Sequence, residues 1–150
     1  MSSRPESRLW ATLQPRLAEE WWADRIENLV GIGFPDVVLT KKAGGNVVYC
    51  ELKAVEKLPA RRATRVFGEA GLRPEQISWI YSRAMSGARC VIVARAARFL
   101  FVVNGGHARV FNDWCLEELC ALSDWYAESA RLTSTVWRGF SGCLLPGGGV

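Results

Sequence analysis

The sequence predicts an α/β domain in which helices flank a central mixed β-sheet, in the order α-β-β-β-α-β-β-α. Three observations predict this class. Of the 150 residues, 49% are apolar, which is enough for one sizeable core. Apolar residues recur at helical spacing in some segments and form short β-branched runs in others. Glycine and proline separate these segments, so each run is expected to form an element of its own.

The N-terminal part is expected to form one helix followed by three strands. The helix opens on a capping-box pattern with Pro5 in its first turn. An apolar stripe then repeats every four residues, at Leu9, Leu13, Leu17 and Trp21. Strands are expected over residues 25–30, 36–40 and 47–54. The glycines within residues 43–46 predict a hairpin between the second and third of these strands.

The second half of the chain is expected to form a helix, two strands and a final helix. These elements cover residues 74–85, 90–94, 99–103 and about 112–130. Asn112 has the side chain of a good N-cap for the last helix. Residues 55–72 contain one proline and two glycines and are expected to form an arginine-rich loop. The tail that follows, to residue 150, is expected to be flexible.

Cysteine usage and hydropathy exclude several classes of function. The five cysteines include no C-x-x-C pair, and His107 is the only histidine, so the ligand set of a zinc site is missing. Reduced, structural thiols are therefore expected. No apolar run reaches membrane-spanning length, and the N-terminus lacks the apolar segment of a signal peptide. These features predict a soluble, cytoplasmic protein with no membrane partner.

The charges are distributed unevenly, and the net charge is +4. Residues 53–65 contain five basic side chains and one acid, and residues 83–98 contain four arginines and no acid. Residues 112–130 contain five acids and no base. This pattern predicts one basic side and one acidic side, and a basic side favours an anionic partner such as nucleic acid. A soluble surface that is simply rich in arginine is the alternative.

Three charged residues stand at the ends of the two hairpin strands. Asp36 opens the first strand, and Glu51 and Lys53 lie near the end of the second. Side chains alternate along a strand, so Glu51 and Lys53 share a face and Leu52 points to the other. In an antiparallel hairpin the start of one strand lies beside the end of its partner. We therefore expect the three charges to converge at one edge of the sheet.

Two carboxylates brought together repel, and each takes up a proton or recruits a cation. Mg²⁺ or Mn²⁺ would satisfy both, and the backbone carbonyl of Leu52 is placed to add an oxygen ligand. A lysine beside such an ion can orient a water molecule and stabilise charge on a phosphate, as hydrolysis of a phosphodiester requires. The structural alternative is that Asp36 caps a turn and that Glu51 and Lys53 form a solvated strand end.

These residues resemble the core motif of the PD-(D/E)XK nuclease superfamily, with Pro35-Asp36 followed by Glu51-Leu52-Lys53. The closer resemblance is to its small phage-type members, of the virus-type replication-repair nuclease (VRR-NUC) kind, and to Holliday-junction resolvases. Further matches lie at residues 25–28, 33–36 and 73–76, Trp79 and Gly87. The resemblance covers about residues 7–111. It implies a restriction-endonuclease-like core within a single nuclease domain over residues 1–150.

The resemblance also implies roles for individual residues. Asp36 and Glu51 would be metal ligands, with Lys53 as the catalytic lysine and Gln76 holding the lysine or a ligand in place. Such nucleases use an upstream acid as well, and Glu27, within Arg25-Ile26-Glu27-Asn28, is the preferred candidate. Glu6, Glu19 and Glu20 are alternatives that are also typical of solvated helix residues. For Gln76 the alternative is an ordinary polar residue in the first turn of a helix. Trp79 is expected to lie in the core, with a base-stacking platform as its alternative.

DNA is the expected partner, and contacts with its phosphates would position it without reading its sequence. The expected phosphate-binding residues follow the catalytic strand and are Lys57, Arg61, Arg62 and Arg65. Their alternative is a plain solvated loop. The expected activity is a Mg²⁺- or Mn²⁺-dependent endonuclease that cuts branched DNA such as Holliday junctions, in a bacterial or phage-infected cell. Symmetric cleavage of a junction needs two active sites, which predicts a homodimer.

Two alternatives remain for the function. The first is a monomeric nicking or flap-type repair nuclease with the same residues in the same roles. The second is a catalytically inactive DNA-binding accessory protein on the same fold, because a fold does not fix a function. The intact Asp36, Glu51 and Lys53 favour an enzyme over the second alternative. A protein-interaction module would leave the basic segments unexplained.

Overall fold

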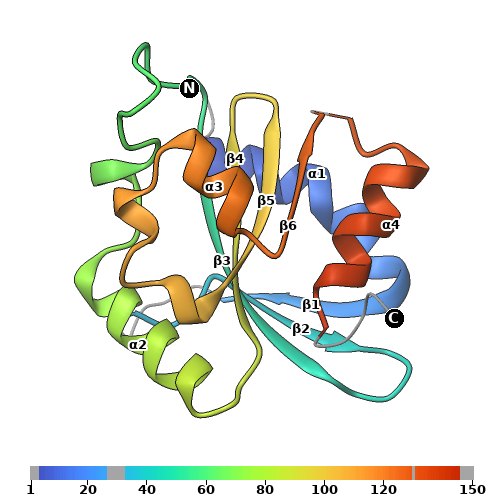
Figure 1. Ribbon diagram of the computed structural model, residues 1–150. Helices are drawn as coiled ribbons and strands as arrows, with labels where there is room; N and C mark the ends of the chain where they lie inside the picture. Colours follow the sequence, from blue (N-terminus) through green and yellow to red (C-terminus); the bar gives the residue numbers. More distant parts are fainter. Residues whose placement is uncertain (1–3, 27–32, 130, 146–150) are drawn as a thin grey trace.

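The structure is a computed structural model that describes residues 4–26, 33–129 and 131–145. Six strands form one sheet in the order β1-β2-β3-β4-β5-β6 (Figure 1). The strands are β1 (Trp21–Arg25), β2 (Val37–Lys41), β3 (Val47–Val55), β4 (Cys90–Ala96), β5 (Phe99–Asn104) and β6 (Trp125–Glu128). β3 and β4 are parallel and every other neighbouring pair is antiparallel, so the sheet is mixed. The predicted fold class, a central mixed sheet flanked by helices, is confirmed.

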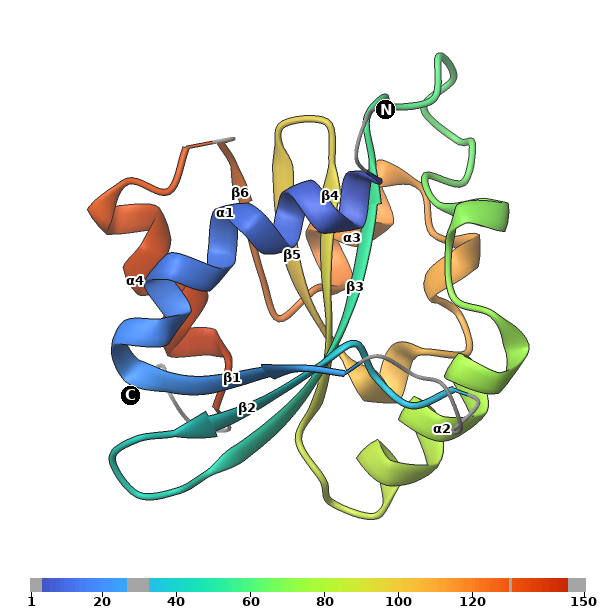
Figure 2. The same cartoon turned by 180° about the vertical axis from the view of Figure 1, so that it is seen from behind.

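Helices cover both faces of the sheet (Figures 1 and 2). On one face lie α1 (Pro5–Glu20) and α4 (Ser134–Cys143), and on the other lie α2 (Pro74–Met85) and α3 (Leu116–Leu122). Three short 3₁₀ turns, η1 (Gly68–Ala70), η2 (Gly105–His107) and η3 (Phe111–Asp113), connect these elements. Each face has its own buried apolar cluster. No helix in the described part of the chain is both long and apolar enough to cross a lipid bilayer.

β3 is the strand that serves both cores. Its residues Cys50, Leu52 and Ala54 are buried in the cluster under α1. Tyr49 packs instead against the cluster under α2, as alternation along a strand requires. Glu51 therefore points to the α2 face among apolar neighbours, although it is a charged residue. This placement is the first sign that the sequence of β3 serves more than packing.

The N-terminal strand differs from the prediction. A strand was expected over residues 25–30, but β1 covers Trp21–Arg25, and residues 27–30 lie outside the described part of the chain. Trp21 fits the four-residue stripe of α1, yet it is the first residue of the strand and pairs with Lys41. The pairing of β1 with β2 is a contact between distant residues, and it overrides the local helical spacing.

The C-terminal part differs most. A helix was expected over about 112–130, but α3 covers only Leu116–Leu122, and Trp125–Glu128 forms β6 against β5. Asn112 is not the N-cap, since its amide accepts from the N–H of Leu72 and donates to the carbonyl of Leu72, at 2.7 Å each. The expected flexible tail contains α4, in which Phe140 is buried. Residues 146–150 lie outside the described part.

Arg89, just before β4, joins the end of α4 to the sheet. Its guanidinium donates to the carbonyls of Cys143 and Leu144, at 2.6 and 3.0 Å, and to Asp124 Oδ2 at 3.2 Å. The first two acceptors are carbonyls at the C-terminal end of α4, which lack partners within the helix. One side chain therefore satisfies three acceptors while only 12% of it is exposed.

We expect Arg89→Met to lower the free energy of unfolding by about 2–4 kcal/mol, because the charge-assisted hydrogen bonds to three acceptors are lost and the carbonyls of Cys143 and Leu144 stay partly buried. The control is Arg138→Met, because Arg138 is exposed on α4 itself. Urea unfolding followed by circular dichroism measures both variants. Equal unfolding midpoints for the two would show that water serves the acceptors of Arg89 equally well.

Candidate functional site

The three predicted charges lie at the point where the sheet divides, beside Asp36 and Glu51, with β1 and β2 to one side and β4, β5 and β6 to the other. We call this point the fork. Val37, the first residue of β2, pairs with Cys50, so Asp36, just before β2 begins, lies opposite Glu51, and β3 continues beyond this point. On the other side of β3, Glu51 pairs with Ile92 of β4. Figure 2 shows β1 and β2 turning away from β4, β5 and β6 while β3 runs along both groups. The expected position at an edge of the sheet was wrong, because β4 continues the sheet beyond β3.

Asp36, Glu51 and Lys53 converge as the hairpin predicted. Asp36 Oδ2 accepts a hydrogen bond from the N–H of Leu52 at 3.0 Å, which ties Asp36 to β3. Lys53 Nζ lies 3.8 Å from Glu51 Oε1. Both Glu51 and Lys53 are buried, at 1% and 9% exposure. The predicted convergence of the three charges is therefore confirmed, and the structural alternative of a solvated strand end is wrong for Glu51 and Lys53.

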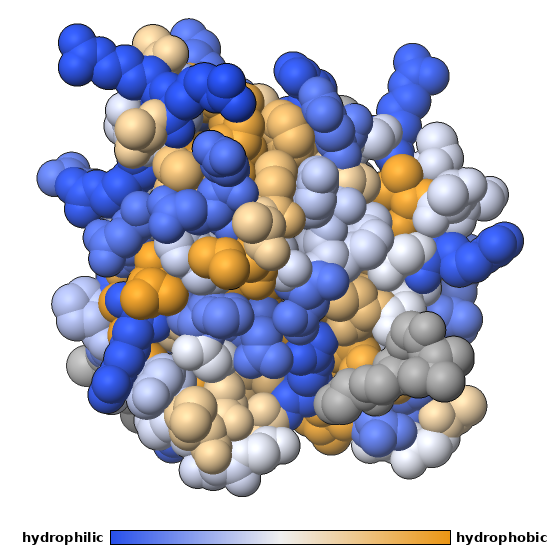
Figure 3. Space-filling model, viewed as in Figure 1, coloured by the Kyte–Doolittle hydropathy of each residue, from blue (hydrophilic) through white to orange (hydrophobic). Residues whose placement is uncertain are grey.

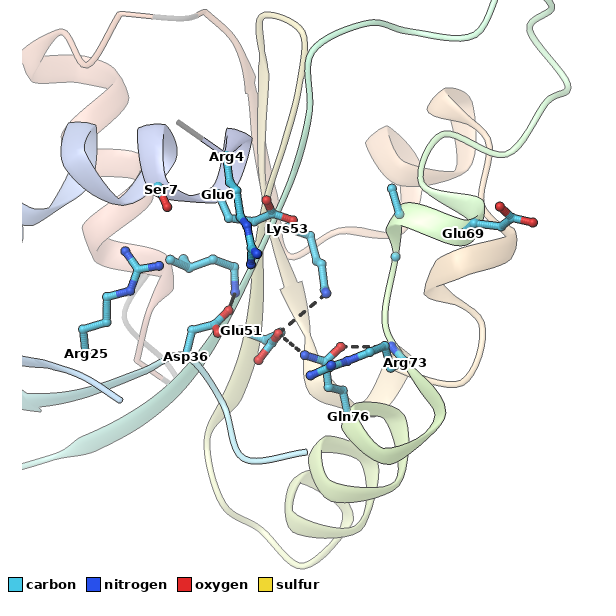
Figure 4. A pocket seen from close by; sticks show the side chains of 13 residues that line it. Arg4, Glu6, Ser7, Arg25, Asp36, Glu51, Lys53, Glu69, Arg73 and Gln76 are labelled. Atoms are coloured by element: carbon cyan, nitrogen blue, oxygen red, sulfur yellow. Dashed lines mark hydrogen bonds and ion pairs between the residues drawn. The ribbon is translucent and has the colours of Figure 1, made fainter. Parts of the chain in front are cut away.

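Gln76 reaches this cluster from the first turn of α2. Its Oε1 accepts from the backbone N–H of Arg73 at 2.9 Å, the capping-box contact of this helix. That contact fixes the amide, so Nε2 points to Glu51 Oε1 and donates to it at 2.6 Å (Figure 4). Gln76 is 5% exposed. A polar residue of an ordinary first turn would be solvated, so the structure favours the role in holding Glu51.

The segment before Asp36 is held by aromatic rings. Phe34 packs edge-on against Trp79 of α2, with ring centroids 5.0 Å apart, and Trp79 packs in the same way against Tyr49 of β3 at 5.4 Å. Trp79 therefore packs against the core, which confirms the placement expected for it. The packing fixes residues 33–36 between α2 and β3, and so fixes Asp36 beside Glu51.

Glu51 has one carboxylate oxygen in use and one without a partner. Oε1 receives Gln76 and faces Lys53, whereas Oε2 is buried and has no hydrogen-bond partner among the described residues. Burial, and next the charge of Asp36, raise the pKa of Glu51 from 4.5 to about 8, although Lys53 acts in the opposite direction. A buried carboxylate oxygen without a partner is costly, and this cost marks a place for a cation or a proton.

This pKa predicts how stability depends on pH in the absence of metal. In the unfolded chain Glu51 titrates near 4.5, and in the folded chain near 8, so the folded state binds the proton more tightly. The free energy of unfolding should therefore fall, by a few kcal/mol, as the pH rises from about 4.5 through about 8.

Urea unfolding in a chelating buffer at about pH 5, 7 and 9 measures this slope. In Glu51→Gln the slope should be much smaller, because the titrating carboxyl is gone. Glu19→Gln serves as the control, since Glu19 is an exposed residue of α1. A wild-type slope that survives in Glu51→Gln would show that another group causes it.

A pocket of about 410 Å³ opens over the fork and contains more acids than were predicted. Glu6, near the start of α1, lines it together with Asp36 and Glu51, and Glu69 lies at its rim (Figure 4). Glu6 was an alternative for the upstream acid, and only the packing of α1 brings it here. Glu19 and Glu20 do not line this pocket. Glu27, the preferred candidate, lies outside the described residues.

The residues at the fork fit a hard divalent cation. In the described part of the chain, no three Asp, Glu, His or Cys side chains are grouped closely enough to hold a metal ion by themselves. Mg²⁺ does not need such a group, because it is usually bound through one or two carboxylates, with water and substrate phosphate completing its shell. Asp36, the orphaned oxygen of Glu51 and the carbonyl of Leu52 supply oxygen donors of this kind.

The loop expected to bind DNA lies apart from this pocket. Lys57, Arg61, Arg62 and Arg65 are all exposed, and none of them lines the pocket over the fork. Arg61 and Arg62 line a separate groove beside Glu117, and Arg65 pairs with Asp113 at 3.5 Å. Figure 3 shows hydrophilic side chains projecting from the end of the molecule that holds this loop and the β4–β5 turn.

The sequence predicted a separate acidic side, and this prediction is wrong for residues 112–129. Its acids pair with arginines from the basic segments, in the contacts Arg65–Asp113, Arg89–Asp124 and Arg98–Glu128. The basic and acidic segments are neighbours in the fold, because β6 pairs with β5 and α3 packs against the same sheet. His107 lies in η2 with its ring 5.1 Å from that of Trp114, away from the fork.

Comparison with known proteins identifies a likeness to solved structures but none to a family model or a curated sequence. No family model matches the chain, and no curated protein sequence matches it. Among solved structures, the chain is similar to Hjc, a Holliday junction resolvase from the hyperthermophilic archaeon Archaeoglobus fulgidus. The two are 18% identical with a TM-score of 0.47, and the match covers 69% of this chain and 75% of that one. The assignment of the site therefore depends on the geometry of this chain.

Proposed function

We propose that this chain is a divalent-metal-dependent endonuclease that hydrolyses phosphodiester bonds in DNA on a restriction-endonuclease-like core. One observation carries the proposal. The buried Glu51 keeps beside Asp36 a carboxylate oxygen that no described residue hydrogen-bonds, while its other oxygen is held by Gln76 and faces Lys53. Packing alone does not select this arrangement, because each buried charge costs stability.

The residues have separate tasks in this proposal. Asp36 and Glu51, with the Leu52 carbonyl, would hold Mg²⁺ or Mn²⁺. When bound, such an ion polarises a phosphate and lowers the pKa of water. Lys53 orients the attacking water and stabilises the negative charge that develops on the phosphate. Gln76 fixes the Glu51 carboxylate through the 2.6 Å hydrogen bond, so that its free oxygen keeps one direction.

A third acid would complete the metal site. Glu27 was preferred from the sequence, and Glu6 is supported by its position in the pocket wall. Titration of Mn²⁺ by electron paramagnetic resonance separates the two. The variant that removes a ligand, Glu6→Gln or Glu27→Gln, should weaken Mn²⁺ binding, and the other should bind Mn²⁺ as the wild type does.

The proposed substrate is branched DNA, with a four-way junction as the first choice, and the proposed assembly is a homodimer. Cutting two strands at symmetric positions needs two active sites, and this chain provides one fork. The loop arginines Arg61 and Arg62 are proposed to contact DNA farther from the scissile bond. The proposed setting is the cytoplasm of a bacterial or phage-infected cell.

The direct test is an incubation of the purified protein with a four-way junction, a flap and a linear duplex of equal length, with and without Mg²⁺. Lys53→Met is assayed beside the wild type, because methionine keeps most of the length of lysine and removes its charge. Metal-dependent cutting of the junction by the wild type, lost in Lys53→Met, supports the proposal. The absence of metal-dependent cutting on all three substrates overturns it, and a preference for the flap selects the monomeric repair nuclease instead.

A further inference from the structure

Three arginines stand around the fork on three different elements. Arg4 precedes α1, Arg25 ends β1, and Arg73 precedes α2, and all three line the pocket that contains Asp36 and Glu51. Each is exposed. They are far apart in the sequence, so only the fold brings them to one rim. The sequence had placed the phosphate contacts elsewhere, in the loop after β3.

The rim arginines do not neutralise the acids beside them. Among the described residues, no ion pair joins Arg4, Arg25 or Arg73 to Glu51 or Asp36. Within residues 4–26, 33–129 and 131–145, the ion pair recorded for a rim arginine is Arg73–Glu75, at 3.6 Å, and it is weak because both partners are partly exposed. The rim arginines therefore share this pocket with Asp36 and Glu51 without pairing with them, whereas Lys53 faces Glu51 Oε1 at 3.8 Å. This arrangement favours two different ligands, a cation for the acids and an anion for the arginines.

The positions of two of these arginines follow from the fork. Arg25 pairs with Val37, next to Asp36, and so stands on the β1–β2 side. The backbone N–H of Arg73 is bound by Gln76, which also binds Glu51, so Arg73 stands on the α2 side. Figure 4 shows Arg25 and Arg73 on opposite sides of Asp36 and Glu51, with Arg4 above them. An extended anion that crosses the carboxylate pair would meet an arginine before and after it.

We propose that Arg25 and Arg73 bind the phosphates on either side of the scissile one, and that Arg4 lies over the same strand. The proposal depends on the proposed function and adds to it the path of the DNA strand, from the end of β1 to the start of α2. Arginine suits this role because its planar fork binds phosphate oxygens through two parallel hydrogen bonds. Such contacts position the strand over the carboxylates without reading its sequence.

The test is DNA binding measured by fluorescence anisotropy on a labelled four-way junction, over a range of salt concentrations, in the Glu51→Gln background. Arg25→Gln and Arg73→Gln should each weaken binding roughly threefold to tenfold at about 0.1 M salt and reduce the salt slope by about 1. Arg73→Lys should keep the slope, because the charge remains. The control Arg138→Gln, on α4, should leave affinity and slope unchanged.

The outcomes separate this proposal from the proposed function. Binding is measured without cleavage. If Arg25 and Arg73 contribute to DNA binding but the wild type never cleaves DNA, only the proposed nuclease activity is overturned. A wild type that cleaves, with Arg25→Gln and Arg73→Gln binding as tightly as Arg138→Gln, overturns the rim. If binding is lost only in the double variant Arg61→Gln with Arg62→Gln, the proposed role of Arg25 and Arg73 is also overturned. The DNA would then be bound by the loop after β3. In cleavage assays the rim variants should raise KM more than they lower kcat.

Discussion

Glu51→Gln should lower metal-dependent DNA cleavage by at least about a hundredfold and, in the absence of metal, make the folded protein more stable above about pH 8. The two effects have one cause. Glutamine has the shape of glutamate, so its oxygen can still accept the hydrogen bond from Gln76, and the buried carboxylate charge beside Asp36 is removed. The same change removes the anionic oxygen that the proposed metal ion requires.

The measurements are single-turnover cleavage of a four-way junction with Mg²⁺ and thermal unfolding in a chelating buffer. Glu69→Gln is the matched control, because Glu69 lines the same pocket but is exposed and points away from Asp36 and Glu51 (Figure 4). It should cut and unfold as the wild type does. Wild-type cleavage by Glu51→Gln would remove Glu51 from the site, whereas lost cleavage with lowered stability would indicate a general defect in the fold.

The part of the site that the sequence predicted is the part built by local contacts. Asp36 and Glu51 are only 15 positions apart, and the turn between β2 and β3 holds Gly44 and Gly45, at φ of +101° and +75°. A hairpin closed by such a turn sets the register of its strands. Gln76 was predictable in the same way, because α2 covers the expected Pro74–Met85 and its capping contact lies within four residues.

The parts that the sequence did not predict are built by distant contacts. Glu6 reaches the pocket because Leu9, Leu13 and Leu17 pack α1 onto the sheet. The residues around Glu6 do not indicate which strands the start of α1 will lie over. The same holds for the rim arginines, which come from three elements. Sequence spacing defines which face of a helix is apolar, but it does not define which end of that helix comes to lie over a neighbouring strand.

Two misplaced elements have a related cause. Trp21 satisfies both the helical stripe and an alternating strand, and Trp125 satisfies both the expected helix and β6. An apolar aromatic residue packs well in a helix or in a strand, so pairing with a neighbouring strand decides which of the two forms. β2 and β5 provide that partner, and neither pairing is visible in the local pattern. The resemblance of the sequence to the nuclease motif ends near residue 111, so it covers none of α3, β6 and α4.

The second large effect is expected at Gly33, three residues before Asp36. Gly33 has φ of +87°, and a Cβ built there would lie 2.3 Å from the carbonyl oxygen of Glu75 and 3.3 Å from the backbone nitrogen of Gln76. A contact below 3.0 Å with backbone cannot be relieved by rotating a side chain, so the first turn of α2 has to move. Gln76 belongs to that turn, and its hydrogen bond to Glu51 would be lost or lengthened.

Gly33→Ala should therefore lower the free energy of unfolding by about 2–4 kcal/mol, as the sum of left-handed backbone strain and overpacking. It should also lower cleavage at least about tenfold, because the Glu51 carboxylate is no longer held in one direction. The control is Gly45→Ala in the β2–β3 turn, where φ is +75° but no atom lies within 4 Å of the added Cβ. Gly45→Ala has the backbone strain without the close contact. We expect it to lower the free energy of unfolding by about 1 kcal/mol and to cleave DNA normally.

The difference between the two glycine variants isolates the close approach of the Gly33 segment to α2. Urea unfolding gives the stability difference, and single-turnover cleavage with Mg²⁺ gives the effect on the site. If both variants lose equal stability and cleave equally, the contact with Glu75 has no effect, and Gly33 serves only its backbone angle. If Gly33→Ala loses stability but cleaves normally, then Gln76 does not control the Glu51 carboxylate, and Asp36 and Lys53 position it without help from α2.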